Sequence, residues 1–335
     1  MKQLGQLFYK QRLRRPMKFV MSTNIDKSET LKPSRCHQWL AHAQFSHPVT
    51  EKQLIETHIS CIFLTGEYAY KVKKNVNLGF VDYSTLQRRK HFYDLEVKLN
   101  RRFAPEIYLG VVAVLETPDG LRFAETESES AIDTTAQFEI VDYAVKMRQF
   151  SQGAIVANRL DHNELTAQSV EEFGRYVANF HSGIESADPS LEYVQPNQIH
   201  LDAIENFETL LDPLAGDPRF KVLEELEVWT EKQFESLQPK LEARLEQGKV
   251  KRCHGDLHLK NVIQVDGKLS AFDGIEFNEQ FQYVDVLREV AFPVMDFFAR
   301  GRRDLGWRLL NAYLEATGDY DLEVMRFYLV YRAMV

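Results

Sequence analysis

The chain has 335 residues, with 41 Lys and Arg against 49 Asp and Glu and a formal net charge of −8. A domain that binds nucleic acid is expected to be basic, so this balance argues against nucleic acid as a partner. Hydrophobic residues make up 44% of the chain, as in ordinary globular proteins, and its length favours two lobes over one. No apolar run is long enough to span a bilayer, so we expect no contact with the membrane interior.

Residues 1–33 form a basic and polar head. Six basic residues and no acidic one occur within the first twenty positions. No apolar segment of the length found in secretory signals follows, so we expect a flexible head. An organelle-type presequence is the alternative.

The three cysteines, Cys36, Cys61 and Cys253, are far apart in the sequence. They form no C-x-x-C pair, which predicts neither a zinc site nor a disulfide framework. This cysteine usage favours a reducing cytoplasm as the location.

Residues 34–150 carry mostly strand patterns. A short helix is expected at 36–45, and the segment 84–102 is strongly helical, with Ser84 as the candidate N-cap. Segments rich in β-branched and aromatic residues predict strands, two of which flank the turn Thr117-Pro118-Asp119-Gly120. The expected strands are 54–60, 61–65, 68–74, 107–115, 121–124 and 138–147. Strands with one long helix predict a small α+β lobe.

A helical lobe is predicted for residues 151–335, because the repeat of apolar residues changes from two positions to 3.6 positions. Further helical stripes cover 223–245 and the region after residue 285. The only strand pattern in this half is 261–273, which Asp266-Gly267 interrupts as a hairpin turn. The first helical stripe consists of Val170, Phe173, Val177 and Phe180.

The segment 252–261, with the sequence RCHGDLHLKN, carries the strongest chemical pattern. Asp256 and Asn261 are five positions apart, and a second acid, Asp273, follows the hairpin. Phosphoryl transfer from a metal-bound nucleotide requires such a set, since hard oxygens hold Mg²⁺ and a carboxylate orients the acceptor hydroxyl. The spacing matches the protein-kinase loop H-R-D-x-x-x-x-N, with Gly255 in place of the Arg.

Three side chains of this pattern have expected roles. Asp256 is expected to accept the proton of the acceptor hydroxyl, and it is ionised at neutral pH because an ordinary Asp has a pKa of about 3.9. Asn261 and Asp273 are expected to hold Mg²⁺ through their oxygen atoms. The alternative is a polar loop in which Asp256 is a cap and Asp273 ends a strand.

These motifs resemble the aminoglycoside phosphotransferase family, a branch of the protein-kinase-like fold, and more narrowly an uncharacterised bacterial subgroup of it. The resemblance to the subgroup covers residues 54–332 and includes the loop 252–261. It implies a two-lobed α+β fold with an antiparallel sheet in the N-terminal lobe. It also implies ATP and Mg²⁺ as cofactors and a small-molecule hydroxyl as acceptor. The other segments that carry it are Glu56-Thr57-His58, FLTGEYAYK at 63–71, Leu99-Asn100-Arg101-Arg102 and FDGIEF at 272–277.

The resemblance implies that Lys71 contacts the nucleotide phosphates, because Tyr68-Ala69-Tyr70-Lys71 corresponds to Val-Ala-Ile-Lys of kinases. Lys73 lies on the same strand face and is the fallback, and two solvated strand lysines are the alternative. A helical acid should pair with the phosphate lysine. Glu96 fits this role better than Asp82 or Asp94.

The phosphates also need a covering loop, and no glycine-rich loop of the protein-kinase type is present. The turn at 58–60 would then cover them with backbone N–H groups and the Ser60 hydroxyl.

Other polar residues surround these motifs. His254 and His258 are expected to hold backbone geometry, with contact to a phosphate or the acceptor as the alternative. Asp285 is expected to anchor the catalytic loop. Glu276 and Glu279 are expected to be solvated, with binding of a cationic substrate as the alternative.

We therefore expect an ATP-dependent phosphotransferase of the cytoplasm that acts on a small-molecule hydroxyl. A nucleotide-binding regulator without catalysis is one alternative, although Lys71, Asp256, Asn261 and Asp273 are all present. A dimetal phosphoesterase is another, but it needs an upstream Asp-x-His, and the chain has only the adjacent pair Asp161-His162. The sequence does not identify the acceptor or the oligomeric state. It also does not determine whether ATP or GTP is the preferred nucleotide.

Overall fold

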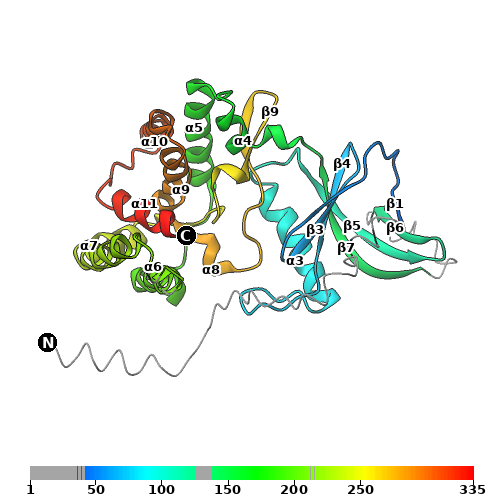
Figure 1. The fold of residues 1–335 in the computed structure, drawn as a ribbon, viewed down its shortest axis with the longest axis horizontal. Helices are drawn as coiled ribbons and strands as arrows, with labels where there is room; N and C mark the ends of the chain where they lie inside the picture. The colour runs from blue at the N-terminus through cyan, green and yellow to red at the C-terminus, as the bar shows by residue number, and fades with distance from the viewer. Residues whose placement is uncertain (1–35, 37–38, 40–41, 126–137, 212, 215) are drawn as a thin grey trace.

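In the computed structural model, the described residues are 36, 39, 42–125, 138–211, 213–214 and 216–335. The head predicted at 1–33 lies outside them. The helix predicted at 36–45 lies partly outside them, and the prediction was wrong at its end, because Ala43–Gln44 form a strand. The described chain forms a sheet lobe and a helical lobe, which meet around helix α3 (Leu86–Asn100) and the hairpin that contains β9 (Figure 1). This architecture confirms the predicted two-lobed α+β fold.

Seven strands form one sheet in the order β1-β6-β5-β7-β4-β3-β2. Neighbouring strands are antiparallel except for β1, which pairs with β6 in parallel. Each predicted strand segment contains a strand, but the segment 54–60 ends early because residues 57–59 form a turn. The strands are β1 Ala43–Gln44, β2 Gln53–Glu56, β3 Ser60–Leu64, β4 Tyr68–Lys73, β5 Tyr108–Thr117, β6 Gly120–Glu125 and β7 Glu139–Arg148.

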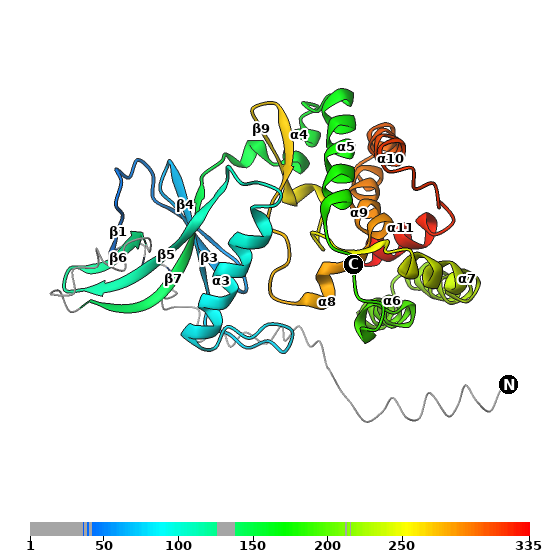
Figure 2. The same cartoon turned by 180° about the vertical axis from the view of Figure 1, so that it is seen from behind.

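Alternation along β4 divides its side chains between two apolar cores. Tyr70 and Val72 belong to the core on one face of the sheet, whereas Ala69 belongs to the core shared with α3. Because side chains of a strand alternate between faces, Lys71 and Lys73 lie on the α3 side with Ala69. Figure 2 shows α3 between the sheet and the helical lobe.

Helix α3 begins one residue later than predicted. Thr85 is its N-cap, since the Thr85 hydroxyl accepts a hydrogen bond from Arg88 N. The prediction of Ser84 was wrong because the Ser84 hydroxyl instead bonds to Asp82 at 2.6 Å.

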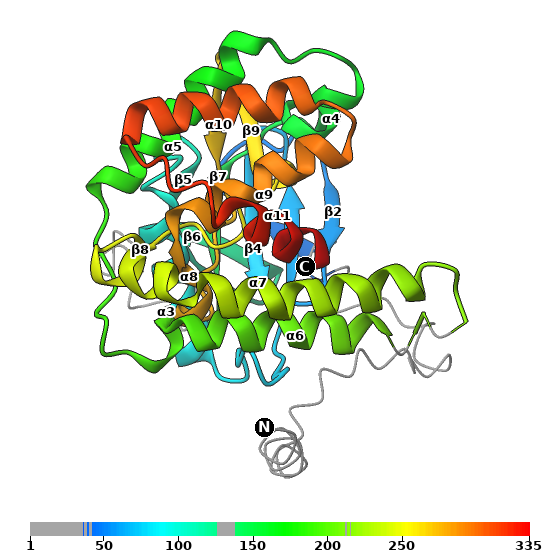
Figure 3. The same ribbon diagram turned by 90° about the vertical axis from the view of Figure 1, so that its left-hand side faces the viewer.

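Among the described residues, the helical lobe encloses one large core and a smaller apolar cluster of Ala187, Val194, Leu245 and Val250. Helix α5 packs against α10, and α9 packs against both α10 and α11. The stripe predicted at 223–245 is one long helix, α7, which lies beside α6 (Figure 3). The helices of this lobe are α4 Val156–Asp161, α5 Ala167–Gly183, α6 Pro196–Leu211, α7 Phe220–Glu246, α8 Glu279–Gln282, α9 Val286–Ala299, α10 Arg303–Thr317 and α11 Met325–Met334. Among the described helices, none combines the length and apolar content that a bilayer crossing requires.

Two short strand ladders lie in the helical lobe. Strands β9 (Val262–Val265) and β10 (Lys268–Ala271) form the predicted hairpin. Strands β8 (Val250–Arg252) and β11 (Tyr283–Asp285) form a second antiparallel pair, so the prediction of a single strand pattern here was wrong. Strands of three residues are too short to show a periodicity of two.

Arg244 of α7 is a fully buried cation. Its guanidinium contacts Asp285 at 2.7 and 2.8 Å and Asp319 at 2.9 and 3.0 Å. Asp285 also caps α9 by accepting a hydrogen bond from Leu287 N. This carboxylate therefore joins α7 to α9 and does not anchor the catalytic loop, contrary to the prediction.

We expect Arg244→Met to lower the free energy of unfolding by about 3–5 kcal/mol, because buried Asp285 would lose its cation and buried Asp319 would keep only Lys249, at 3.4 Å. Urea denaturation measures this change. Lys240→Met is a matched control on the same helix, because Lys240 makes a partly exposed pair with Asp321 at 2.7 Å. That substitution should cost no more than about 1 kcal/mol. Similar losses in the two variants would contradict the assigned role of Arg244.

Candidate active site

The loop that follows β8 is held by Glu289 of α9. This buried carboxylate accepts hydrogen bonds from His254 N at 2.7 Å and from Gly255 N at 3.2 Å. Gly255 has a φ of +87°, and a Cβ at this position would lie 2.5 Å from the carbonyl oxygen of Phe281. The loop thus requires glycine here. Glu289 is the anchor that the sequence analysis assigned to Asp285.

Asp256 and Asn261 contact each other across the loop. Asn261 Nδ2 donates to Asp256 Oδ2 at 2.9 Å and to the Asp256 carbonyl oxygen at 3.0 Å. His258 Nε2 lies 3.4 Å from the same carboxylate oxygen. Burial would raise the pKa of Asp256, but the hydrogen bond and charge of His258, followed by the charge of His254, hold that pKa below its ordinary value. The carboxylate is therefore ionised at neutral pH.

The two histidines of the loop contact backbone groups. His254 Nε2 lies 2.9 Å from the Phe272 carbonyl oxygen, and His258 Nδ1 accepts a hydrogen bond from Lys260 N at 3.2 Å. These contacts agree with the geometric role expected for both.

The hairpin brings Asp273 back to the loop. Phe272 N donates to the Asn261 carbonyl oxygen at 2.9 Å, and Asp273 follows with a φ of +60°. Lys71 Nζ lies 2.5 Å from Asp273 Oδ1. Partial burial would raise the pKa of the half-exposed Asp273 carboxylate, but the Lys71 ammonium outweighs this effect and lowers the pKa.

Lys71 and Lys73 share Glu96 of α3. Lys71 Nζ lies 2.8 Å from Glu96 Oε1, and Lys73 Nζ lies 2.5 Å from Oε2. Burial would raise the pKa of Glu96, but the two ammonium groups lower it. Both lysines are buried, so the alternative of two solvated lysines was wrong. The competing acid Asp94 is exposed and pairs with Lys90.

Glu276 is buried, which corrects the expectation of a solvated side chain. It forms an ion pair with Lys73 and accepts a hydrogen bond from the Tyr83 hydroxyl at 2.8 Å. The ion pair between Lys73 and Glu276 was not predicted, although the spacing of Lys71 and Lys73 places a second cation on the same strand face. Glu279, by contrast, is exposed.

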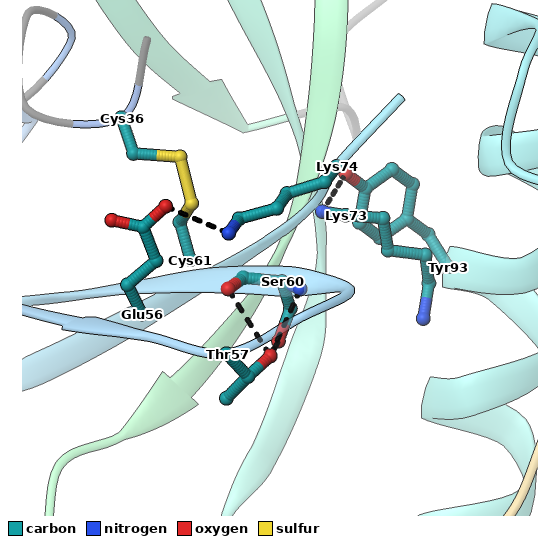
Figure 4. The surroundings of a disulfide bond; sticks show 8 residues. All are labelled: Cys36, Glu56, Thr57, Ser60, Cys61, Lys73, Lys74 and Tyr93. Carbon is teal, nitrogen blue, oxygen red and sulfur yellow. Dashed lines mark hydrogen bonds and ion pairs between the residues drawn. A yellow bond between two sulfur atoms is a disulfide. The ribbon is translucent and has the colours of Figure 1, made fainter. Parts of the chain in front are cut away.

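The turn between β2 and β3 does not present the Ser60 hydroxyl. Ser60 is only 3% exposed, and its Oγ lies 2.9 Å from Thr57 Oγ1 (Figure 4). Ser60 N also donates to Thr57 Oγ1. This placement counts against the expected contact between Ser60 and a phosphate. Thr57 and His58, at the tip of the turn, are exposed.

A disulfide joins Cys36 to Cys61, next to this turn, although the sequence analysis predicted no disulfide. Glu56 and Lys74 form an ion pair beside it at 2.7 Å (Figure 4). The pairing could not be read from spacing, because 25 positions separate the two cysteines and only the fold brings them together. Cys253 is free and buried. Because disulfides are uncommon in a reducing cytoplasm, the cysteines no longer support that location.

An apolar cavity of about 170 Å³ adjoins the ion pairs. Lys71 and Asp273 line it together with side chains of the sheet and of the connection after β7. The apolar lining residues are Ile55, Ile62, Leu64, Ala69, Tyr108, Met147, Phe150, Ile155 and Phe272.

The sheet lobe with its one long helix, followed by a helical lobe that carries the loop and hairpin, defines a protein-kinase-like fold. No family model matches the chain. Uncharacterized proteins of Mycobacterium tuberculosis and Mycobacterium bovis are 26% identical to it over 298 residues, which cover 87% of this chain and 55% of theirs. The chain thus spans about half the length of these curated relatives.

Solved structures of small-molecule kinases are similar at low identity. Choline kinase from Cryptosporidium parvum Iowa II has a TM-score of 0.46 at 11% identity, covering 85% of this chain and 80% of that one. A choline/ethanolamine kinase family protein from Mesorhizobium loti has a TM-score of 0.44 at 10% identity, covering 86% and 77%. ADP-bound aminoglycoside phosphotransferase APH(2'')-Ib has a TM-score of 0.42 at 15% identity, covering 89% and 86%.

His181 of α5 lies beneath the loop, where its ring is close to the side chains of Cys253 and Glu289. Its Nδ1 lies 2.9 Å from the Tyr313 hydroxyl. Burial, and to a lesser extent the charge of Lys251, lower the pKa of His181 to about 3. The folded protein therefore keeps this imidazole neutral across the mildly acidic range.

We expect His181 to lower the free energy of unfolding as the pH falls from 7 to 5. The unfolded chain protonates this residue near pH 6.5 whereas the folded chain does not, so the unfolded state binds more protons below that pH. His181→Gln should remove about 2 kcal/mol of the stability lost over this window, as measured by urea denaturation at both pH values. The exposed His162 is the control, and His162→Gln should keep the wild-type pH dependence. An unchanged pH dependence in His181→Gln would show that the imidazole can charge in the fold.

Proposed function

We propose that the chain is an ATP-dependent phosphotransferase that acts on a hydroxyl of a small molecule. The observation that carries the proposal is the convergence of Lys71, Glu96 and Asp273 at one end of an apolar cavity, with Asp256 and Asn261 at the base of the same hairpin. Side chains from both lobes contribute to this arrangement. Charge-stabilising and metal-binding groups placed in this way are what phosphoryl transfer requires.

The oxygen donors fit a magnesium ion. Asp273 uses Oδ1 for the Lys71 ammonium, which leaves Oδ2 as the atom that would bind the ion. Asn261 uses its Nδ2 for Asp256, which leaves Oδ1 as the atom that would bind the metal. Carboxylate and amide oxygens are ligands that Mg²⁺ accepts. When bound, the ion would neutralise charge on the phosphates.

The cavity fits the remainder of a nucleotide. Its apolar walls, including Ile62, Met147 and Phe272, suit a flat heterocyclic base. Lys71 lies at the polar end, where its ammonium would contact phosphate oxygens. Glu96 holds that ammonium on the cavity side of β4.

Asp256 would orient the acceptor hydroxyl and accept its proton. Its lowered pKa makes it a weak base, but it remains ionised and therefore available. A weak base suffices because positioning and charge stabilisation contribute most of the catalysis in phosphoryl transfer.

A dimetal phosphoesterase is less well supported. Among the described residues, the groups of side chains that could bind a metal are Cys36, Glu56 and Cys61 in one place and His181, Cys253 and Glu289 in another. Neither group contains Asp256 or His258, the residues that this alternative needs. A nucleotide-binding regulator without catalysis stays as the second candidate, because it would use the same Lys71 and Asp273.

We expect Mg²⁺ with ATP to raise the unfolding temperature of the wild type, since a ligand at 100 times its Kd adds about 2.7 kcal/mol of stability. Asp273→Asn should abolish this rise, because the variant lacks the carboxylate that would hold the ion. Asp266→Asn, at the turn of the same hairpin, should keep it. Thermal unfolding with Mg²⁺ alone, with ATP alone and with both provides the comparison. No rise in the wild type would contradict the nucleotide site.

Asp256→Asn should retain the ATP-dependent rise but lower kcat by roughly 10²–10⁴. The assay is release of ADP with water as acceptor and with a panel of sugars and amino alcohols. Equal turnover in the variant and the wild type would rule out Asp256 as the base. A wild type that binds Mg²⁺-ATP without turning it over would favour the regulator.

A further inference from the structure

Three side chains of the sheet lobe hold the segment 273–276. The Tyr108 hydroxyl of β5 accepts a hydrogen bond from Asp273 N at 3.0 Å, and Asn100 Oδ1 of α3 accepts one from Gly274 N at 2.8 Å. Lys73 of β4 forms an ion pair with Glu276. The three residues Lys73, Asn100 and Tyr108, called the clasp below, thus come from three different elements of one lobe.

The clasp is buried and its geometry is determined. Lys73 is 2% exposed, Asn100 is 0% exposed and Tyr108 is 1% exposed. Asn100 Nδ2 donates to the Glu96 carbonyl oxygen at 3.0 Å, which directs Oδ1 toward Gly274 N. Lys73 lies between Glu96 and Glu276 and is neutralised by both. If one of these groups changed its partner, a buried polar atom would be left without a hydrogen bond or ion pair.

The clasped backbone is in a conformation that needs support. Asp273 has a φ of +60°, and this left-handed region is unfavourable for a residue with a Cβ by roughly 1–2 kcal/mol. Gly274 is closely packed between the loop and α3. A Cβ at this position would lie 3.2 Å from His254 Cδ2 and 3.4 Å from Asn100 Oδ1. The surroundings therefore determine where the Asp273 carboxylate is placed.

We propose that Lys73, Asn100 and Tyr108 are positioning residues that act through Asp273, setting its carboxylate for the metal ion. This inference rests on the proposed function. Because Lys73 also binds Glu96, the clasp sets the Lys71–Glu96 pair and the metal carboxylate in one rigid unit. A shift of α3 would accordingly move Asp273.

The first test measures the clasp without any ligand. Amide hydrogen exchange of the full chain should be at least tenfold faster across residues 273–276 in Tyr108→Phe and in Asn100→Leu than in the wild type. Tyr313→Phe is the matched control, because it removes one hydroxyl contact of a fully buried tyrosine in the helical lobe. It should leave the exchange of this segment unchanged. Unchanged exchange in both clasp variants would overturn the proposal.

The second test measures the effect on the metal. Tyr108→Phe and Asn100→Leu should need at least tenfold more Mg²⁺ for half-maximal ATP binding, while their affinity for ATP without Mg²⁺ stays within twofold of the wild type. A role in stability alone would leave the Mg²⁺ requirement unchanged in the folded variants, and that result would overturn the proposal. If the wild type shows no Mg²⁺-dependent binding of ATP, the proposed function fails, and with it the metal role of the clasp; faster exchange would then show only that the clasp holds the segment.

Lys73 needs its own variant, since Lys73→Met alone leaves Glu276 buried without a cation. The double variant Lys73→Met with Glu276→Gln removes one charge of each sign, and Glu96 keeps Lys71. The double variant should show the same tenfold rise in the Mg²⁺ requirement. If the folded double variant needs no more Mg²⁺ than the wild type, Lys73 does not help to position Asp273.

Discussion

Five charges of alternating sign, four of them buried, form the interaction on which the site depends. They follow the order Asp273, Lys71, Glu96, Lys73 and Glu276, so that each ammonium lies between two carboxylates. Removing one partner from such a series leaves an uncompensated buried charge, which costs several kcal/mol. Strand β4, helix α3 and the segment after the hairpin are therefore constrained together.

The loop that carries Asp256 is constrained from the opposite side. Glu289 holds the backbone of His254 and Gly255, and Arg332 of α11 donates to the Gly255 carbonyl oxygen at 3.3 Å. The helical lobe thus sets the position of Asp256, the proposed base, whereas the sheet lobe sets the position of Asp273, the proposed metal ligand. The two meet where Phe272 N bonds to the Asn261 carbonyl oxygen. The relative position of the lobes therefore determines the distance between the Asp256 and Asp273 carboxylates.

Features that depend on neighbouring residues could be predicted from the sequence. The hairpin at 261–273, the long helix α3 and the two-lobed layout all follow from apolar periodicity and turn residues. The pairing of Lys71 with Glu96 was expected from the family resemblance and not from periodicity, and the contact of Asn261 with Asp256 was not predicted. Partners that come from distant parts of the chain could not be predicted. Glu289 lies 35 positions from His254, and strands β1 and β2 lie between Cys36 and Cys61.

Burial was the other quantity that local patterns could not supply. Ser60 and Glu276 both follow motif residues, and both were expected to be accessible, yet each is enclosed by its own polar partner. By itself, the sequence determined which segments form strands and helices and which residue types stand in the loop. Only the tertiary structure decided which charges neutralise one another and which hydroxyls stay free. The energy of a charged or polar group depends on its distance from water and from distant partners, and chain order does not contain those distances.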